Sequence, residues 1–130
     1  MDYPTLLDTE SFKISAYSLE SVIAEKFEAM IVLDVRNSRM KDFYDIYDIL
    51  MNGHIDSTVL KEAVRLTFER RRTILPEDPA IFQDGFSSDP RNLQLWKAFL
   101  NRIKAEQIEF SVTIEVVTRQ LQPIYRSLLK

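Results

Sequence analysis

One lysine occupies a position where the helical pattern calls for an apolar side chain. Residues 19–33 read LESVIAEKFEAMIVL, and their apolar residues recur at the three- and four-residue spacing of a helix. At about 100° per residue, Lys26 falls within roughly 20° of the centre of that apolar stripe. Since an unpaired ammonium is almost never fully buried, we expect an anion to lie against it. That anion is either a carboxylate of this protein or the phosphate of a ligand.

Three carboxylates recur on the next helical segment, residues 40–51. Asp42, Asp45 and Asp48 are three residues apart, so neighbouring carboxylates share one flank of a helix. Asp42 falls at the edge of the apolar stripe, roughly 90° from its centre, whereas Asp45 and Asp48 lie further toward solvent. If the two helices pack as a hairpin, Asp42 is therefore predicted to meet Lys26 at about 4 Å or through one water.

This pair has two interpretations, which the sequence leaves open. Arg39 and Lys41 stand beside Asp42 and add positive charge at the start of the second helix. The pair between Lys26 and Asp42 is either a structural salt bridge or part of a functional site. Because apolar replacements of a buried ion pair are often as stable, retaining the pair is mild evidence for a function.

Composition excludes several classes of protein. A chain of 130 residues with 45% apolar residues predicts one packed domain. The absence of cysteine excludes disulfides and zinc–thiolate sites and predicts a cytoplasmic protein. Its apolar stretches are too short to span a bilayer, so no membrane association is expected. The two glycines stand in no phosphate-binding loop, and the net charge of −3 gives no general attraction to nucleic acid.

The periodicity predicts an all-α protein, a bundle of about five helices behind an irregular N-terminal segment. Residues 1–17 are predicted to form an irregular connection whose only plausible strand is 12–17, and residues 18–130 a single helical domain. Four residues are predicted to cap the starts of helices: Ser18, Asp56, Asp89 and Ser111. Pro90 is predicted at the first position of the helix that Asp89 caps. The helices are expected over 18–35, 40–51 and 56–72, from 90 to at least 103, and from 111 onward, with a short turn at 79–83. Pro123 is expected to kink or split the last helix.

The remaining candidates favour structural roles. His54, the single histidine, has no partner at metal-ligand spacing. The run Arg70 to Arg72 ends a helix, where a solvated end is favoured over a patch that binds RNA phosphates. Trp96 and Phe99 are expected in the core, on an apolar face that also includes Leu93, Leu100 and Ile103.

Two segments carry a resemblance to a known family. LESVIAEKFEAM (19–30) and NSRMKDFYDIYDIL (37–50) resemble the C-terminal half of the AbiEii/AbiGii nucleotidyltransferase toxin family. The first matches its glutamate–lysine motif at Glu25-Lys26. The second matches its arginine-x-lysine-aspartate-x-x-aspartate motif at Arg39, Lys41, Asp42 and Asp45. The segments 67–76 and 95–103 also look like one branch of the family, so the resemblance covers about residues 3–105.

The resemblance implies roles for these residues. Lys26, Asp42 and Asp45 would be catalytic, and Lys26, Arg39 and Lys41 would bind substrate, Lys26 by contacting a triphosphate. In the family, the N-terminal half is polymerase-β-like and holds Mg²⁺ and the NTP with a Gly-Ser motif and an Asp-x-Asp pair. This chain contains neither motif, so the resemblance implies a helical half without its catalytic half and with no metal ligand of its own.

The leading hypothesis is thus the helical C-terminal domain of an AbiEii-type toxin, inactive alone because it has no metal-binding carboxylate pair. No cofactor is expected for this chain by itself, whereas Mg²⁺ and NTP are implied for the complete family member. The implied partners are a catalytic N-terminal half, a cognate antitoxin and an RNA acceptor such as tRNA. The alternative is a free-standing or truncated helical module that acts by protein interaction. The leading hypothesis also predicts an uncovered apolar face over Tyr3 to Tyr17 and the first two helices, which a homodimer could satisfy.

Overall fold

The computed structural model describes residues 18–33 and 39–129. Within these ranges the secondary structure is helical and contains no strand, so the predicted all-α class is confirmed. The described part contains five α-helices and two short 3₁₀ helices. They are α1 (Leu19–Leu33), α2 (Met40–Asn52), α3 (Ser57–Arg70), η2 (Ala80–Phe82), η3 (Phe86–Ser88), α4 (Pro90–Ile103) and α5 (Phe110–Leu128). The predicted irregular segment 1–17, its strand 12–17 and the end of the first helix near Val35 lie outside the described residues.

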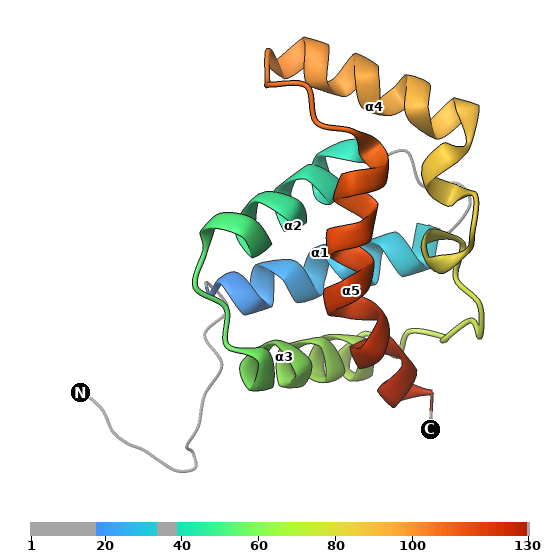
Figure 1. Cartoon of the computed structure of the whole chain (residues 1–130). Helices are drawn as coiled ribbons and strands as arrows, with labels where there is room; N and C mark the ends of the chain where they lie inside the picture. The colour runs from blue at the N-terminus through green and yellow to red at the C-terminus, as the bar shows by residue number, and fades with distance from the viewer. Residues whose placement is uncertain (1–17, 34–38, 130) are drawn as a thin grey trace.

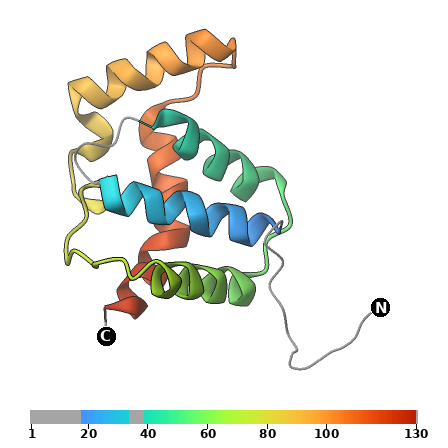
Figure 2. The same cartoon turned by 180° about the vertical axis from the view of Figure 1, so that it is seen from behind.

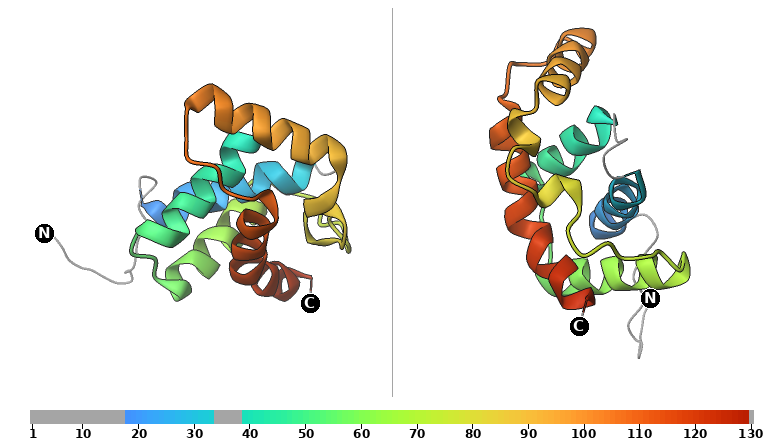
Figure 3. Two further views of the ribbon diagram at one scale, coloured as in Figure 1. Left: turned by 45° about the horizontal axis from the view of Figure 1, so that its top comes forward. Right: turned by 90° about the vertical axis from the view of Figure 1, so that its right-hand side faces the viewer.

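The helices form a row with one long helix across it. Seen from behind, α2, α1 and α3 lie one below another, with α1 in the middle, and α5 runs across their far side (Figures 1 and 2). α4 lies beyond α2 at the end of the row away from α3 and leans away from the body of the molecule (Figure 3). The middle helix is thus flanked by a neighbour on each side.

Side-chain caps begin three of the helices, as the sequence predicts. The Ser18 hydroxyl accepts a hydrogen bond from the Ser21 N–H at 3.0 Å. The Asp56 carboxylate accepts from the Thr58 N–H at 2.9 Å, and Asp89 caps α4 in the same manner ahead of the proline at its first position. These contacts satisfy backbone N–H groups that a helix start leaves without partners.

The start of α5 differs from the prediction. The helix begins at Phe110, and Ser111 is an exposed residue of its first turn rather than the cap. Burial decides this start, because Phe110 is only 1% exposed and the Trp96 indole N–H donates to the Ile108 carbonyl at 2.6 Å. Farther along, α5 continues unbroken through Pro123, so the predicted split does not occur. Pro123 lies on the exposed side of the helix.

Aromatic side chains fill the core in two groups, and α5 contributes to both. Near its end, the Tyr125 ring lies 6.1 Å from the Phe27 ring of α1 in an edge-to-face contact. Near its start, the Phe110 ring lies 5.7 Å from the Phe43 ring of α2. Each group has further members: Phe68 and Phe82 around Tyr125, and Phe86, Trp96 and Phe99 around Phe43 and Phe110. α5 therefore fixes α1 and α2 relative to each other.

The apolar stripes of α1 and α2 are covered by this chain's own helices. Phe27 on α1 and Phe43 and Ile46 on α2 are completely buried. The predicted uncovered docking face is therefore wrong for the described part of these helices, because α3 and α5 occupy the positions expected of a partner. The large apolar residues that remain exposed on the two helices are Leu19, Val32 and Met51. Tyr3 to Tyr17 lie outside the described residues, and the homodimer stays a prediction.

The outer helix α4 contributes to the apolar core mainly through its middle. Trp96, Phe99 and Leu100 are buried as predicted, whereas Leu93 and Ile103 are 42% and 43% exposed, against the prediction. At the end of the row, the first turn of α4 contacts η3 through the buried Asn92, whereas its last turn extends past the core (Figure 3).

Candidate functional site

The site lies where α1 and α2 pack as an antiparallel hairpin, the arrangement on which the sequence argument depends (Figure 1). At one end of the hairpin, α2 ends against the first residue of α1. A Cβ on Gly53 would lie 2.8 Å from the Ile49 carbonyl oxygen and 2.9 Å from Cδ1 of Leu19, closer than real side chains allow. Gly53 is thus required for close approach, and its backbone has an ordinary negative φ of −97°.

Lys26 reaches across this hairpin to two carboxylates. Its Nζ lies 3.2 Å from Oδ1 of Asp42, which confirms the predicted contact, and 3.1 Å from Oδ2 of Asp45. The Asp42 side chain is 3% exposed and the Lys26 side chain 23% exposed. The ammonium is therefore paired but still reachable from solvent.

Asp45 lies closer to the site than the helical wheel places it. Its side chain is 25% exposed and is shared between Lys26 and Lys41, whose Nζ is 2.6 Å from Oδ2. The wheel treats side chains as radial, whereas a lysine extends along its neighbour and reaches a carboxylate on the flank. Asp48, one turn further, is exposed as predicted and accepts a hydrogen bond from Asn52.

Arg39 meets the second oxygen of the buried carboxylate. Its Nε lies 2.7 Å from Oδ2 of Asp42, and its side chain is half exposed. The contact is an ion pair without hydrogen-bond geometry, because Oδ2 of Asp42 accepts no hydrogen bond from the described residues. Each oxygen of Asp42 thus faces one cation, Lys26 on one side and Arg39 on the other. We call Lys26, Arg39, Lys41, Asp42 and Asp45 the α1–α2 network.

The surroundings of Lys26 keep it charged. Partial burial lowers the pKa of the ammonium, but hydrogen bonds and charges from Asp45 and Asp42 outweigh that effect and raise the pKa of Lys26 above its ordinary value. Lys26 is therefore a permanent cation near neutral pH, and an anionic ligand at this place meets a fixed positive charge.

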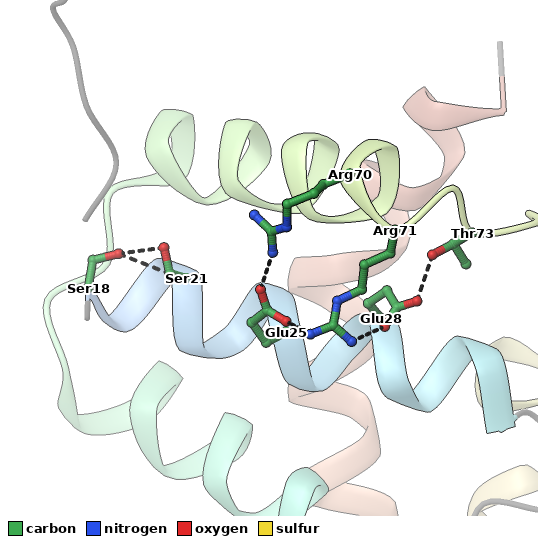
Figure 4. Close-up of polar contacts among 7 residues, drawn as sticks. All are labelled: Ser18, Ser21, Glu25, Glu28, Arg70, Arg71 and Thr73. Carbon is green, nitrogen blue, oxygen red and sulfur yellow. Dashed lines mark hydrogen bonds and ion pairs between the residues drawn. The ribbon is translucent and has the colours of Figure 1, made fainter. Parts of the chain in front are cut away.

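The opposite flank of α1 carries a second ionic network, with the charges exchanged. Glu25 pairs with Arg70 at 2.5 Å and with Arg71 (Figure 4). Arg71 also contacts Glu28 at 3.2 Å, and the Thr73 hydroxyl donates to the other oxygen of Glu28 at 2.6 Å. These five residues, the α1–α3 network, join the middle helix to the end of α3.

This network adds partners to the arginine run. Arg70 to Arg72 are exposed at the end of α3, as predicted, but Arg70 and Arg71 also pair with carboxylates of α1. Only Arg72 forms no ion pair with the described residues, and it is exposed. The spacing of Glu25 and Glu28 on one flank of α1 was the available signal in the sequence, and it needed the α1–α3 packing to be interpreted.

The described residues do not fit a metal ion. They contain no group of three or more His, Cys, Asp or Glu side chains able to hold one. Asp42 and Asp45 face cations at close range, which suits holding a lysine rather than Mg²⁺. His54 is exposed in the connection between α2 and α3.

The fold and the site together define a class: an all-helical domain that presents a paired, charged lysine with no metal centre in its described residues. Comparison with protein families gives the class a name. A model described as "Nucleotidyl transferase AbiEii toxin, Type IV TA system" matches residues 1–120. The chain belongs to this family of nucleotidyltransferase-type toxins, and the family's toxin–antitoxin system implies a cognate antitoxin.

Two further comparisons found no relative. No curated protein and no solved structure matched the chain. Among the described helices, none combines the length and the apolar character needed to cross a membrane. Because no curated protein and no solved structure matched, the roles of individual residues are argued from the geometry described above.

Proposed function

We propose that this chain is the helical domain of an AbiEii-type nucleotidyltransferase toxin and that Lys26 binds the triphosphate of the NTP. One observation carries the proposal: Lys26 is held charged between two carboxylates, yet its side chain remains 23% exposed. A lysine ammonium has three N–H donors. Asp42 and Asp45 take two of them, which leaves one for a phosphate oxygen.

In this proposal the two aspartates position the lysine. Asp42, buried at the hairpin, fixes the place of Nζ, and Asp45 shares its charge between Lys26 and Lys41. Arg39 and Lys41 lie on the exposed side, where they add positive charge for the substrate. Phosphoryl-group transfer depends mainly on positioning and charge stabilisation, and preplaced cations supply both.

The metal-binding half has to come from outside these residues. The chain contains no Gly-Ser pair and no Asp-x-Asp, and its site carboxylates are engaged with cations. We therefore assign Mg²⁺ and most of the NTP contacts to a catalytic half with those motifs. The completed site would transfer a nucleotide to an RNA acceptor such as tRNA, by in-line attack at the α-phosphate.

Nucleotide transfer with matched lysine variants tests this assignment. RNA, Mg²⁺ and each α-labelled NTP are incubated with the chain alone, and then with a protein that supplies the Gly-Ser and Asp-x-Asp motifs, encoded with it or beside it. We expect no label incorporation by the chain alone and clear incorporation by the combination. Lys26→Met should reduce the combined activity at least about 100-fold, the order expected for losing one charged contact in the transition state.

Lys61→Met is the control, because Lys61 is exposed on α3 and forms no ion pair with the described residues. Equal activity of the Lys26 and Lys61 variants would contradict the role of Lys26. Transfer by the chain alone would contradict the need for a second half.

The covered faces of α1 and α2 favour a second candidate, a self-contained interaction module. Phe27, Phe43 and Ile46 are buried without any partner chain, as such a module requires. If no catalytic half restores transfer and the chain is captured by its cognate antitoxin, this second candidate replaces the first.

A further inference from the structure

A pocket between α2 and α4 adjoins the α1–α2 network. It has a volume of about 280 Å³ and lies between the start of α2 and the last turns of α4. Arg39, Lys41 and Asp42 line it from α2, and Phe99 and Arg102 line it from α4. Its size suits one small polar group rather than a whole cofactor.

The pocket has an excess of positive charge in an acidic protein. Three cations line it, Arg39, Lys41 and Arg102, against the single carboxylate of Asp42. That carboxylate is buried and already paired on both oxygens. The chain as a whole has a net charge of −3, so this concentration of positive charge is local. Such a lining attracts an anion.

Arg102 is the cation of the pocket with unused hydrogen-bonding capacity. Its guanidinium lies over the Phe99 ring, 5.8 Å from the centroid, and no carboxylate of the described residues lies within 4 Å of it. Its place in the last turn of α4 favours the helix dipole, but that interaction uses none of its five N–H donors. The planar group is thus held on the pocket wall with donors free to form a bidentate contact.

We propose that the α2–α4 pocket is a second phosphate site, in which Arg102 binds a phosphate ester next to the one at Lys26. The proposal rests on the proposed function, since it places this phosphate beside the triphosphate held by Lys26. The shared carboxylate supports the arrangement: Asp42 faces Lys26 with one oxygen and Arg39, at the pocket, with the other. An acceptor strand must bring its terminal hydroxyl in line with the α-phosphate, so its nearest phosphodiester must bind close by.

Two sources of phosphate ester fit this chemistry, and the test separates them. One is the phosphodiester of a single-stranded acceptor, and the other is the phosphate chain of the nucleotide itself. Binding to the 130-residue chain is measured with a fluorescein-labelled single-stranded RNA of about twelve nucleotides, by anisotropy, over a series of salt concentrations. ATP and GTP are measured by the fluorescence of Trp96, the single tryptophan, whose ring lies 6.0 Å from Phe99.

The variants are Arg102→Gln and, as a matched control, Arg91→Gln. Arg91 is exposed on the first turn of the same helix and does not line the pocket. We expect Arg102→Gln to weaken RNA binding about tenfold and to lower the salt slope by about 0.7, and Arg91→Gln to change neither appreciably. Since both side chains are exposed, circular dichroism should show the wild-type helix content in both variants.

Each outcome decides between the hypotheses. If Arg102→Gln weakens ATP or GTP binding and leaves RNA binding unchanged, the pocket holds the nucleotide's own phosphates. If the two arginine variants behave alike, or if neither RNA nor nucleotide binds the wild-type chain, the phosphate site is overturned. Lys26→Met separates the two proposals: normal nucleotide binding by that variant argues against the proposed function, and an effect of Arg102→Gln still supports the pocket.

Discussion

The two flanks of α1 carry ionic networks of opposite polarity, built from adjacent residues. Glu25 points to the arginines of α3, and Lys26 points to the aspartates of α2. In the α1–α3 network every charge on α1 is met by a cation or a hydroxyl from the end of α3. In the α1–α2 network, by contrast, cations exceed carboxylates and the lysine remains reachable. The first arrangement closes on itself and serves stability, whereas the second retains capacity for an anion.

Removal of the buried carboxylate should have the largest effect on stability. Asp42→Ala leaves Lys26 and Arg39 without their shared partner at a position only 2% exposed. We expect a loss of about 2–4 kcal/mol in the free energy of unfolding, measured in urea. Asp48→Ala, an exposed position of the same helix, is the control and should cost less than about 0.5 kcal/mol. Similar losses at both positions would show that Asp42 does not organise the α1–α2 network.

The second largest loss of stability is expected in the α1–α3 network. Glu28→Gln removes the charge that binds Arg71 and Thr73 at a side chain 5% exposed, and we expect a loss of about 1–2 kcal/mol in the same measurement. Glu115→Gln, which breaks an exposed pair with Arg119 on α5, is the matched control with an effect below about 0.5 kcal/mol. The comparison between the two networks also requires that Glu28→Gln leave phosphate binding unchanged.

Replacement of the lysine should cost less stability than either carboxylate. Lys26→Met keeps most of the apolar stem of the side chain, and Asp42 and Asp45 keep Arg39 and Lys41 as partners. We expect a change of less than about 1 kcal/mol in the free energy of unfolding, since the lysine is only partly buried and both carboxylates keep another cation. A loss as large as that of Asp42→Ala would show that the α1–α2 network has a structural role, like the α1–α3 network.

The smallest expected effect is a dependence on alkaline pH. Because the pKa of Lys26 is raised in the folded state, its stabilisation is complete below the unfolded pKa of about 10.4 and is lost as pH rises through the folded value. The wild type should therefore lose stability relative to Lys26→Met between about pH 9 and about pH 12, and not between about pH 6 and about pH 9. Urea unfolding of both proteins over this range measures it, and a constant difference would contradict the raised pKa.

Local patterns predicted most of the helices correctly. The caps at Ser18, Asp56 and Asp89 are short-range contacts within one turn, so the sequence alone carries them. The helical spacing of residues 56–72 also predicts the inward face of α3, and its five members are all buried against α1 and α5: Leu60, Ala63, Val64, Thr67 and Phe68. The last helix was different: its start is set by the burial of Phe110 rather than by the serine that follows.

One contact of the site could be predicted from the sequence, but the full set of interacting residues could not. The contact between Lys26 and Asp42 followed from a charge in an apolar stripe, since such a charge requires a partner. Asp45 was placed too near the solvent, because a helical wheel ignores the reach of a lysine side chain. The partners of Arg70 and Arg71 lie about 45 positions away in the sequence, and no spacing rule connects such residues.

The sequence by itself determined the all-α class, the starts of α1, α3 and α4 and the need for an anion at Lys26. It did so because these properties depend on neighbours within a few residues, or on the cost of burying one charge. Only the tertiary structure decided which flank of α1 faces which helix, and so which network is closed and which stays open. Those assignments depend on how α5 joins the two aromatic groups and on how far α4 extends past α2, and both follow from packing between segments distant in the chain.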